Sequence, residues 1–239
     1  MKYISITKKK TLYRIMSCLI VIPFRKREEQ LRQYLKEVLP LFMKHLNKFK
    51  VVVMEQGDDK PFNRGALMNI AFKEYKNKYD YLITNDVDIF PTEETVKKYY
   101  TMKKDVVRIY CAHQESCGGI CKIKSNVFSR CNGFPSDIWG WGVEDRSLYF
   151  RLRTFNILVG DVIYPPVKLL GNPEDENTKQ IKKLFINHRR RQIENQMFRR
   201  ANLEKRKTFY YKSGLNSLQY TTMEKKEIHK HVDLIKIIF

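Results

Sequence analysis

Short apolar runs alternate with amphipathic stretches through the first hundred residues of this 239-residue chain. The apolar runs have the length of buried strands and lie at residues 18–22, 50–54 and 81–84. Apolar side chains recur at helical spacing over residues 28–46, 63–75 and 92–102. Pro40 lies within the first of these helices and is expected to kink or split it. The alternation predicts an α/β fold whose first half contributes a largely parallel sheet flanked by helices.

Polar and charged residues follow each of the predicted strands. They are Arg25 to Arg27, Phe62 to Arg64, and Asp86 to Asp88. In open α/β sheets, ligands bind beyond the carboxyl ends of the strands, so one cleft can hold all three groups.

The composition is that of one basic globular domain. The hydrophobic content of 43% in 239 residues is enough for a single core, and residues 1–16 are expected to be a short basic lead. Lysine and arginine total 46 against 26 acidic residues, a formal net charge of +20. This excess favours phosphate-bearing small molecules, polyanionic acceptors, nucleic acid or acidic membranes as partners, without choosing among them.

Five cysteines form an odd, sparse set, which is not the disulfide framework of a secreted module. Cys117 and Cys121 have no second ligand pair and are interpreted as small core residues. The apolar run at residues 16–24 is too short to cross a bilayer and lacks a cleavage site. We therefore expect a cytoplasmic protein with no signal peptide or transmembrane anchor, which associates weakly with anionic membranes through its basic surface.

The segment Trp139 to Asp145, with sequence WGWGVED, places two indoles and two glycines against two carboxylates. Tryptophan is usually well buried and acidic residues rarely are, so the segment is typical of a wall between core and cleft where a sugar binds. The alternative is a buried aromatic turn followed by a helix whose first turn carries acids that suit the helix dipole. The segment alone does not separate these readings.

Asp86 and Asp88 leave a predicted strand as alternate residues, so both carboxylates can point to one place. Mg²⁺ and Mn²⁺ accept such oxygen ligands together with substrate phosphates. The alternative is a solvated turn whose aspartates cap the next helix. Arg25, Arg27 and Arg64 can offer forked contacts to phosphate, or can be ordinary surface charges.

Five segments, in this order along the chain, resemble the β-1,4-galactosyltransferase family. They are Pro23 to Arg27, Phe62 to Arg64, Asp86 to Asp88, Cys131 to Pro135 with Trp139 to Asp145, and Ser213 to Ser217. The resemblance covers roughly residues 20–220. It implies a GT-A type fold with a mixed, mostly parallel central sheet. It also implies an inverting reaction that moves a hexose, galactose or an N-acetylhexosamine, from a UDP-sugar to a hydroxyl of a glycan acceptor, with Mn²⁺ or Mg²⁺ as cofactor.

The resemblance also implies roles for individual residues. Those assigned to the donor nucleotide and diphosphate are Pro23, Phe24, Arg25, Arg27, Phe62, Arg64, Asp86, Val87 and Asp88. Asp88 and His188 would bind the metal, and Trp141 would contact both donor and acceptor. Gly142, Val143, Glu144 and Asp145 would border the acceptor, with Asp145 as the catalytic base.

The chemistry agrees with these roles. Inverting transfer needs one carboxylate that deprotonates the attacking hydroxyl, which suits Asp145. A metal-bound diphosphate is already a stable leaving group, so no second carboxyl acts as an acid and Glu144 is available to hydrogen-bond acceptor hydroxyls.

Three departures from the family pattern leave details open. Arg146 stands where the family usually has an acid, so acceptor choice is open. Phe185 stands where many members have a metal-binding methionine, so the metal gains a water or binds less tightly. Ser116 and Cys117 replace a bulky residue ahead of Gly118, leaving room for an N-acetyl group on the donor.

Residues 189–212 are strongly basic, and the resemblance implies a mobile lid there, whereas composition alone equally suits a solvated basic helix.

Two other functions fit parts of the chain. A nucleic-acid-binding protein would explain the charge but has no use for the acids at 144–145, so no nucleic-acid partner is expected. A metal-dependent nucleotidyltransferase would use Asp86 and Asp88 but leaves Glu144 and Asp145 unexplained.

Overall fold

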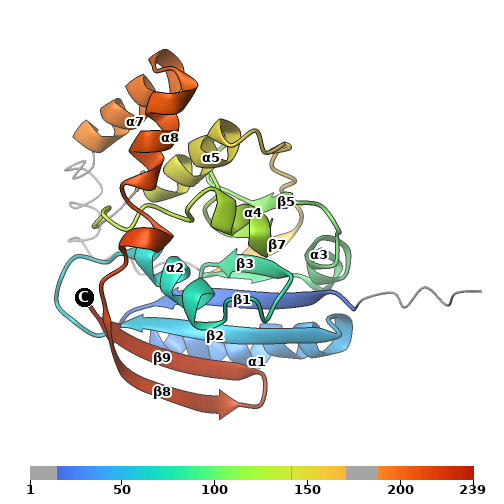
Figure 1. The fold of residues 1–239 in the computed structure, drawn as a ribbon. Helices are drawn as coiled ribbons and strands as arrows, with labels where there is room; N and C mark the ends of the chain where they lie inside the picture. Colours follow the sequence, from blue (N-terminus) through green and yellow to red (C-terminus); the bar gives the residue numbers. More distant parts are fainter. Residues whose placement is uncertain (1–14, 141, 171–187) are drawn as a thin grey trace, which may run out of the picture.

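The computed structural model describes residues 15–140, 142–170 and 188–239. A seven-stranded sheet in the order β5-β6-β3-β1-β2-β9-β8 forms the centre (Figure 1). Its strands are β1 (Ser17–Phe24), β2 (Lys48–Gln56), β3 (Tyr81–Asn85), β5 (Val106–Tyr110), β6 (Ile120–Lys124), β8 (Thr221–His229) and β9 (Val232–Ile238). Two short strands, β4 (Ile89–Pro91) and β7 (Val167–Leu169), pair with each other outside this sheet.

The sheet is mixed and mostly parallel. β3, β1, β2 and β9 lie side by side in parallel, and β6 and β8 run antiparallel to their neighbours at the two sides of this group. β5 is antiparallel to β6 and so runs in the direction of the parallel group. The α/β fold class predicted from the sequence is therefore confirmed.

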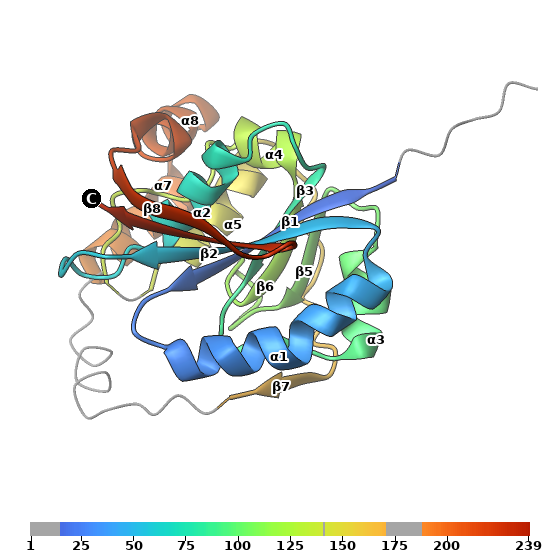
Figure 2. The same ribbon diagram turned by 90° about the horizontal axis from the view of Figure 1, so that it is seen from below.

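Helices cover both faces of the sheet, with α1 and α3 on one side and α2, α4 and α5 on the other (Figures 1 and 2). Their bounds are α1 (Glu28–His45), α2 (Arg64–Glu74), α3 (Glu93–Thr95), α4 (Ser125–Arg130) and α5 (Glu144–Thr154). A π-helical turn over Val96–Tyr100 continues α3, and a 3-10 turn spans Leu215–Ser217. α7 (His188–Arg200) and α8 (Leu203–Tyr211) lie beside α5 (Figure 1).

The central strand, β1, is an unbroken apolar run because the sheet is covered on both faces. All eight residues of β1 are buried, and successive side chains enter opposite cores. Ile20 and Ile22 join the cluster under α1, whereas Leu19 and Val21 join the cluster under α2. A strand covered on both faces has no solvent side and therefore shows no polar alternation.

The predicted helices are present with small changes. The helix expected over residues 28–46 is α1, which buries Leu31, Tyr34 and Phe42 and stays continuous through Pro40, so the proline does not split it. α2 begins after Asn63, whose side chain accepts a hydrogen bond from the Ala66 amide at 2.9 Å. The sequence did not lead us to expect β9, which pairs in parallel with β2 and buries Val232 in one core and Ile235 and Ile237 in the other.

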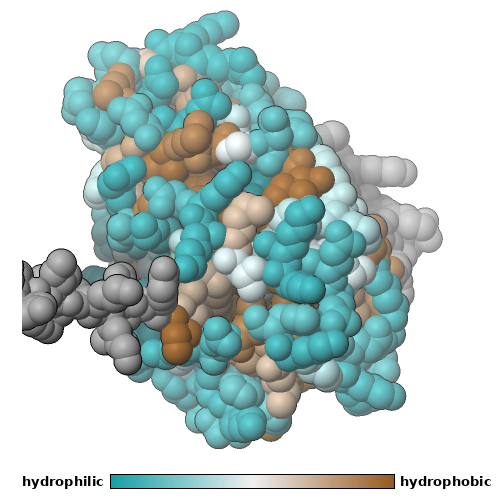
Figure 3. All heavy atoms as spheres, turned by 90° about the vertical axis from the view of Figure 1, so that its right-hand side faces the viewer, coloured by the Kyte–Doolittle hydropathy of each residue, from teal (hydrophilic) through white to brown (hydrophobic). Residues whose placement is uncertain are grey.

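All five cysteines are buried and free, consistent with core packing. Among residues 15–140, 142–170 and 188–239, no helix is long and apolar enough to cross a bilayer. On the side of β5 and α3, hydrophilic residues cover most of the surface and apolar residues form separate patches (Figure 3).

Candidate active site

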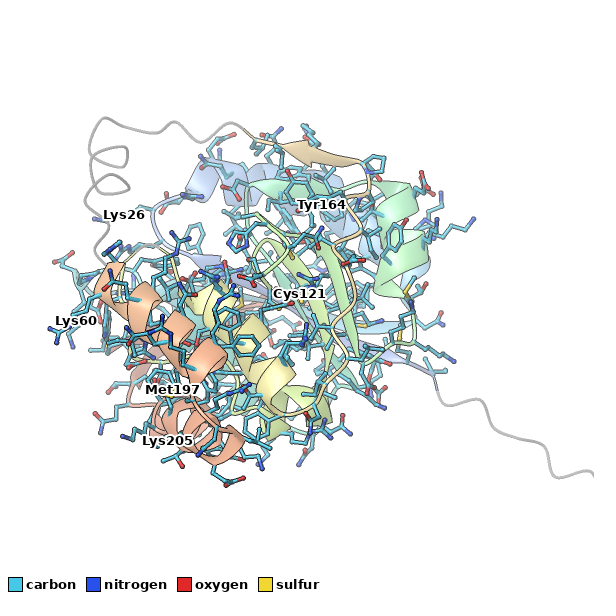
Figure 4. The ribbon with its side chains drawn as sticks, turned by 90° about the horizontal axis from the view of Figure 1, so that it is seen from above. Lys26, Lys60, Cys121, Tyr164, Met197 and Lys205 are labelled. Carbon is cyan, nitrogen blue, oxygen red and sulfur yellow. The ribbon has the colours of Figure 1, made fainter. Side chains whose placement is uncertain are left out.

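A cavity of about 630 Å³ lies where the end of β3 meets the starts of α5 and α7. Asp86 and Asp88 contribute from the turn after β3, and Gly142 to Arg146 contribute from the first turn of α5. The turn before β6, residues 112–119, and the first turn of α7 complete much of its lining. Figure 4 looks down on this region, with Met197 marking α7, Lys205 marking α8 and Cys121 marking the sheet.

Arg64, the first residue of α2, holds three carboxylates together at the base of the cavity. Its Nε donates to Asp86 Oδ1 at 2.8 Å, and its Nη1 donates to Asp145 Oδ1 at 2.5 Å. Glu144 Oε1 lies 3.9 Å from the same Nη1. Burial alone would lower the pKa of Arg64, but Asp145, Asp86 and Glu144 outweigh it and the net pKa is raised. The guanidinium therefore stays charged and fixes the positions of Asp86 and Asp145.

Glu144 and Asp145 differ in their access to the cavity. The Glu144 side chain is 8% exposed and that of Asp145 is 26% exposed. Burial raises the pKa of Glu144 and the pKa of Asp145. The charge of Asp145 raises the pKa of Glu144 further, and the charge of Asp86 raises the pKa of Asp145 further. Within the part of the chain that the structure describes, Glu144 Oε2 has no hydrogen-bond partner. Two crowded carboxylates with raised pKa values line one cavity, and the more exposed of them, Asp145, is suited to taking a proton from a ligand.

The backbone beside these acids is tightly constrained. A Cβ atom built on Gly118 would lie 2.0 Å from Asp145 Oδ2, so only glycine leaves room for this carboxylate. The Cys117 amide donates to the Asp145 carbonyl at 3.1 Å. Val143, which caps α5, has φ 80°, a conformation that is rare for a β-branched residue. Such strain clusters at functional sites, because it persists only where the surrounding structure holds it.

The two residues assigned to a metal, Asp88 and His188, line the same cavity from different elements. Arg27 Nη1 donates to Asp88 Oδ2 at 3.1 Å. Burial, followed by the neighbouring Asp86, raises the pKa of Asp88 despite this arginine, so the negative charge of Asp88 is only partly balanced. His188 is exposed at the start of α7, with Nε2 3.0 Å from Gln192 Nε2. An oxygen ligand and an imidazole on one cavity suit Mn²⁺ or Mg²⁺ supplemented by phosphate oxygens, although no cluster of three protein ligands occurs among the described residues.

Other predicted donor residues lie behind or beside the cavity. Arg27 and Arg64 contact its acids without lining it. The Arg25 guanidinium lies 5.2 Å from the ring centroid of Phe62, and both stand apart from the cavity lining. Pro23 and Phe24 are buried residues of β1, and Val87 is buried in the turn after β3. Trp141 and Phe185 fall outside the described residues.

α7 is attached to α5 by a buried polar network and an aromatic stack. Glu194 is fully buried and accepts from Ser147 Oγ at 2.9 Å and from Arg190 Nε at 3.1 Å. Arg190 also donates to Asp137 Oδ2 at 2.7 Å. The rings of Phe150 and Phe198 stack at 4.2 Å. These contacts bring His188 and Arg191 of α7 to the cavity.

Sequence reasoning missed several residues of the lining: Tyr110, His113, Leu169, Leu170 and Arg191. None belongs to a motif, and the basic run at 189–191 does not indicate which arginine faces the site. Ser116, which the sequence analysis connected with donor choice, does line the cavity, whereas Cys117 is buried behind it.

Two family models match the chain. One, described as the N-terminal region of glycosyl transferase group 7, matches residues 8–102. The other, described as the N-terminal domain of galactosyltransferase, matches residues 86–162. β-1,4-Galactosyltransferase 5 of Mus musculus is 31% identical over 211 residues, which are 84% of this chain and 51% of that protein. The chain belongs to the β-1,4-galactosyltransferase family.

A second family member, β-1,4-galactosyltransferase 1 of Bos taurus, is 28% identical over 216 residues, 86% of this chain and 50% of that protein. The chain therefore spans about half the length of the relatives it matches. The resemblance of the motifs to the β-1,4-galactosyltransferase family is thereby confirmed.

Solved structures support the same fold. A mutant of Drosophila β-1,4-galactosyltransferase 7, in complex with manganese, UDP-Gal and xylobiose, aligns with a TM-score of 0.74 at 21% identity over 94% of each chain. The mannosyltransferase PcManGT of Pyrobaculum calidifontis, in complex with GDP-Man and Mn2+, aligns with a TM-score of 0.58 at 12% identity over 81% of this chain and 68% of that one. At such identities these likenesses concern the fold alone, and they confirm the GT-A type predicted for this family member.

Proposed function

We propose that this chain is an inverting, metal-dependent glycosyltransferase that moves a hexose from a UDP-sugar to a hydroxyl of an acceptor sugar. One observation carries the proposal: the accessible carboxylate of Asp145 shares a cavity of about 630 Å³ with Asp88 and His188. A base and a metal-binding pair within one cavity are what transfer from a nucleotide sugar requires. Family membership and the UDP-Gal named for the Drosophila structure support this donor class.

In this proposal Asp145 takes the proton of the attacking hydroxyl. Arg64 holds Asp145 Oδ1 at 2.5 Å, and Asp145 Oδ2 faces Gly118, so the carboxylate has one orientation. The pKa of Asp145 is raised by burial, so it is a stronger base than an exposed aspartate. Glu144, deeper and adjacent, would accept hydrogen bonds from other hydroxyls of the acceptor.

Asp88 and His188 would hold Mn²⁺ or Mg²⁺ together with the donor diphosphate. When bound, the cation would neutralise the diphosphate as it leaves. The incompletely balanced charge of Asp88 fits that ligand. Ser116 is small at its place in the lining, which leaves galactose and N-acetylhexosamines open as the transferred sugar.

The test is a panel of UDP-sugars assayed for release of UDP with and without Mn²⁺, using water or simple glycosides as acceptors. We expect metal-dependent UDP release from at least one UDP-hexose. Asp145→Asn should lower transfer by about 10²–10⁴-fold while leaving UDP binding intact in a thermal-shift assay. Asp88→Ala should abolish the metal-dependent part of UDP binding.

Asp105→Asn is the matched control, because Asp105 is 60% exposed and pairs only with Lys124 among the described residues. It should behave as wild type. Unchanged turnover in Asp145→Asn, or UDP binding that ignores both the metal and Asp88, would contradict the proposal. Nucleotidyl transfer in the absence of any sugar transfer would favour the nucleotidyltransferase alternative.

A further inference from the structure

Arginine side chains line the same cavity as Glu144 and Asp145. Arg146 and Arg191 both contribute to the lining, from the first turns of α5 and α7. Both arginines lie near His113. Burial has the largest lowering effect on the pKa of His113, and the charges of Arg146 and Arg191 lower it further. We call Arg146 and Arg191, with Arg199 and Glu115 behind them, the arginine wall.

The arginine wall has more positive charge than its acid can neutralise. Glu115 forms an ion pair with Arg146 Nη2 and another with Arg199 Nη2, the latter at 3.3 Å. Arg191 is exposed and makes no ion pair within residues 15–140, 142–170 and 188–239. Arg146 and Arg199 therefore share one carboxylate, and Arg191 lines the cavity without an ion pair to any described residue.

The cavity acids pair with Arg27 and Arg64 and form no ion pair with Arg146 or Arg191 among the described residues. Arg64 pairs with Asp86 and Asp145, and Arg27 pairs with Asp88. Arg146 is also held in place: its guanidinium lies 4.9 Å from the Phe150 ring centroid, its side chain is 15% exposed, and its buried Nε lacks a partner in the described chain. A fixed guanidinium whose donors are only partly used is ready to bind an oxyanion.

Resting on the glycosyltransferase function proposed above, we propose that the acceptor carries an anionic group, which Arg146 and Arg191 bind. Arg146 lines the same cavity as Asp145, the proposed base for the acceptor hydroxyl, so an anion on the acceptor would lie within its reach. A carboxylate of a uronic acid and a phosphate ester on a sugar both offer the paired oxygens that a guanidinium fork matches. The positive wall would then select acceptors by charge.

The experiment compares matched acceptors. Methyl β-glucuronide and methyl β-glucoside differ only at C6, where a carboxylate replaces the hydroxymethyl group, and glucose 6-phosphate and glucose differ only in a phosphate. With the UDP-sugar found to be hydrolysed, kcat/KM should be about tenfold higher for the anionic member of at least one pair, as a charge-assisted contact provides. The pair that shows the preference identifies the source of the anion.

Variants connect the preference to the arginine wall. Arg191→Gln and Arg146→Gln should each raise KM for the anionic acceptor about five- to tenfold with kcat little changed, because binding of the anion does not alter the chemical step. Glu115→Gln should strengthen the preference about twofold by releasing Arg146. Arg191 is exposed, so its variant tests the proposal without risk to folding. Arg200→Gln removes one charge from α7 outside the cavity lining and should match wild type.

The outcomes separate this proposal from the function on which it rests. Intact hydrolysis of a UDP-sugar with equal use of both members of each pair would overturn the anionic acceptor alone. A loss of UDP affinity in Arg191→Gln, without any change of acceptor preference, would also overturn it by assigning the arginine to the donor. No turnover of any UDP-sugar would overturn both.

Discussion

The cavity has two charged sides that are built differently. On one side Asp86, Asp88, Glu144 and Asp145, here called the carboxylate wall, stand at the end of β3 and the start of α5, and Arg64 binds three of them. On the other side the arginine wall depends on α7, a helix attached from the C-terminal part of the chain. Every acid of the carboxylate wall is paired with Arg27 or Arg64, whereas Arg191 of the arginine wall has no ion-pair partner among the described residues. The first is therefore part of the fold, and the second is available to a ligand.

The largest difference between the two walls should appear in the unfolding free energy when an arginine of each wall is removed. Arg64→Met leaves three crowded carboxylates without their shared cation, and breaking a buried ion pair on one side costs about 3–5 kcal/mol of unfolding free energy. The matched change in the arginine wall, Arg191→Met, should alter that free energy by no more than about 0.5 kcal/mol, because the side chain is exposed. Urea denaturation at neutral pH measures both. Similar losses in the two variants would refute the distinction between the walls.

Gly118→Ala should affect activity more than folding. The added Cβ would lie 2.0 Å from Asp145 Oδ2, so the carboxylate must turn away from its place. Misplacement of a reacting group by about 1 Å can lower the rate about 100-fold. The measurement is UDP release per folded protein, with folding checked by thermal denaturation. Gly160→Ala is the control, because its added Cβ would meet nothing within 4 Å. Equal activity of the two variants would contradict the fixed position of Asp145.

Acid should act on stability and activity in opposite directions at the carboxylate wall. The pKa values of Glu144 and Asp145 are raised by burial, so the folded state holds protons that the unfolded chain releases. The stabilising contribution of the protonated pair is complete below the ordinary carboxylate range and is lost as the pH rises through the raised values. In the proposed mechanism, transfer, in contrast, requires Asp145 to be ionised.

The acid limb of kcat/KM should therefore lie at least about one pH unit above the limb that an exposed aspartate would give. A displacement of one pH unit corresponds to about 1.4 kcal/mol of difference between the two protonation states. Asp86→Asn should move the limb to lower pH, because Asp86 raises the pKa of Asp145. A limb that keeps its position in Asp86→Asn, or that lies in the ordinary aspartate range, would show that Asp145 is not the group being titrated.

The carboxylate wall was largely predictable from the sequence, because strand ends bring local motifs to one edge of a sheet. Asp86, Asp88, Glu144 and Asp145 were all named, and all line the cavity. The link through Arg64 was not foreseen as an ion pair, since the motif assigned that arginine to phosphate. Nothing local to residues 64 and 145 records that they meet.

The arginine wall was not predictable in the same way. Arg191 is one of three consecutive arginines, and only the docking of α7 through Glu194 and Phe198 decides which of them faces the cavity. The same limit applies to β9, which we did not predict and whose place beside β2 depends on pairing between segments far apart in the chain. Short segments determine the type of an element, and long-range contacts determine its neighbours.

The smallest loss of unfolding free energy is predicted for a variant that weakens the attachment of α7. It tests whether the arginine wall depends on this helix while the carboxylate wall does not. Asp137 joins this helix through Arg190 and accepts from Ser213 Oγ at 2.6 Å. The Asp137 side chain is 47% exposed, so solvent screening limits the loss in Asp137→Asn to about 0.5–1 kcal/mol of unfolding free energy. Burial opposes ionisation, but the Ser213 hydroxyl and Arg190 together lower the pKa of Asp137. The contribution is therefore present above the ordinary aspartate pKa and is lost as the pH falls through the lowered value.

A double-mutant cycle with Arg190→Gln isolates the ion pair from the hydroxyl contact. The coupling energy should disappear in acid, and the variants should lose anionic-acceptor preference by about twofold while the acid limb of kcat/KM keeps its position. This follows because a looser first turn of α7 displaces Arg191, together with His188, but leaves Asp145 bound to Arg64. A displaced acid limb would mean that the helix supports both walls, and the contrast between them would fail.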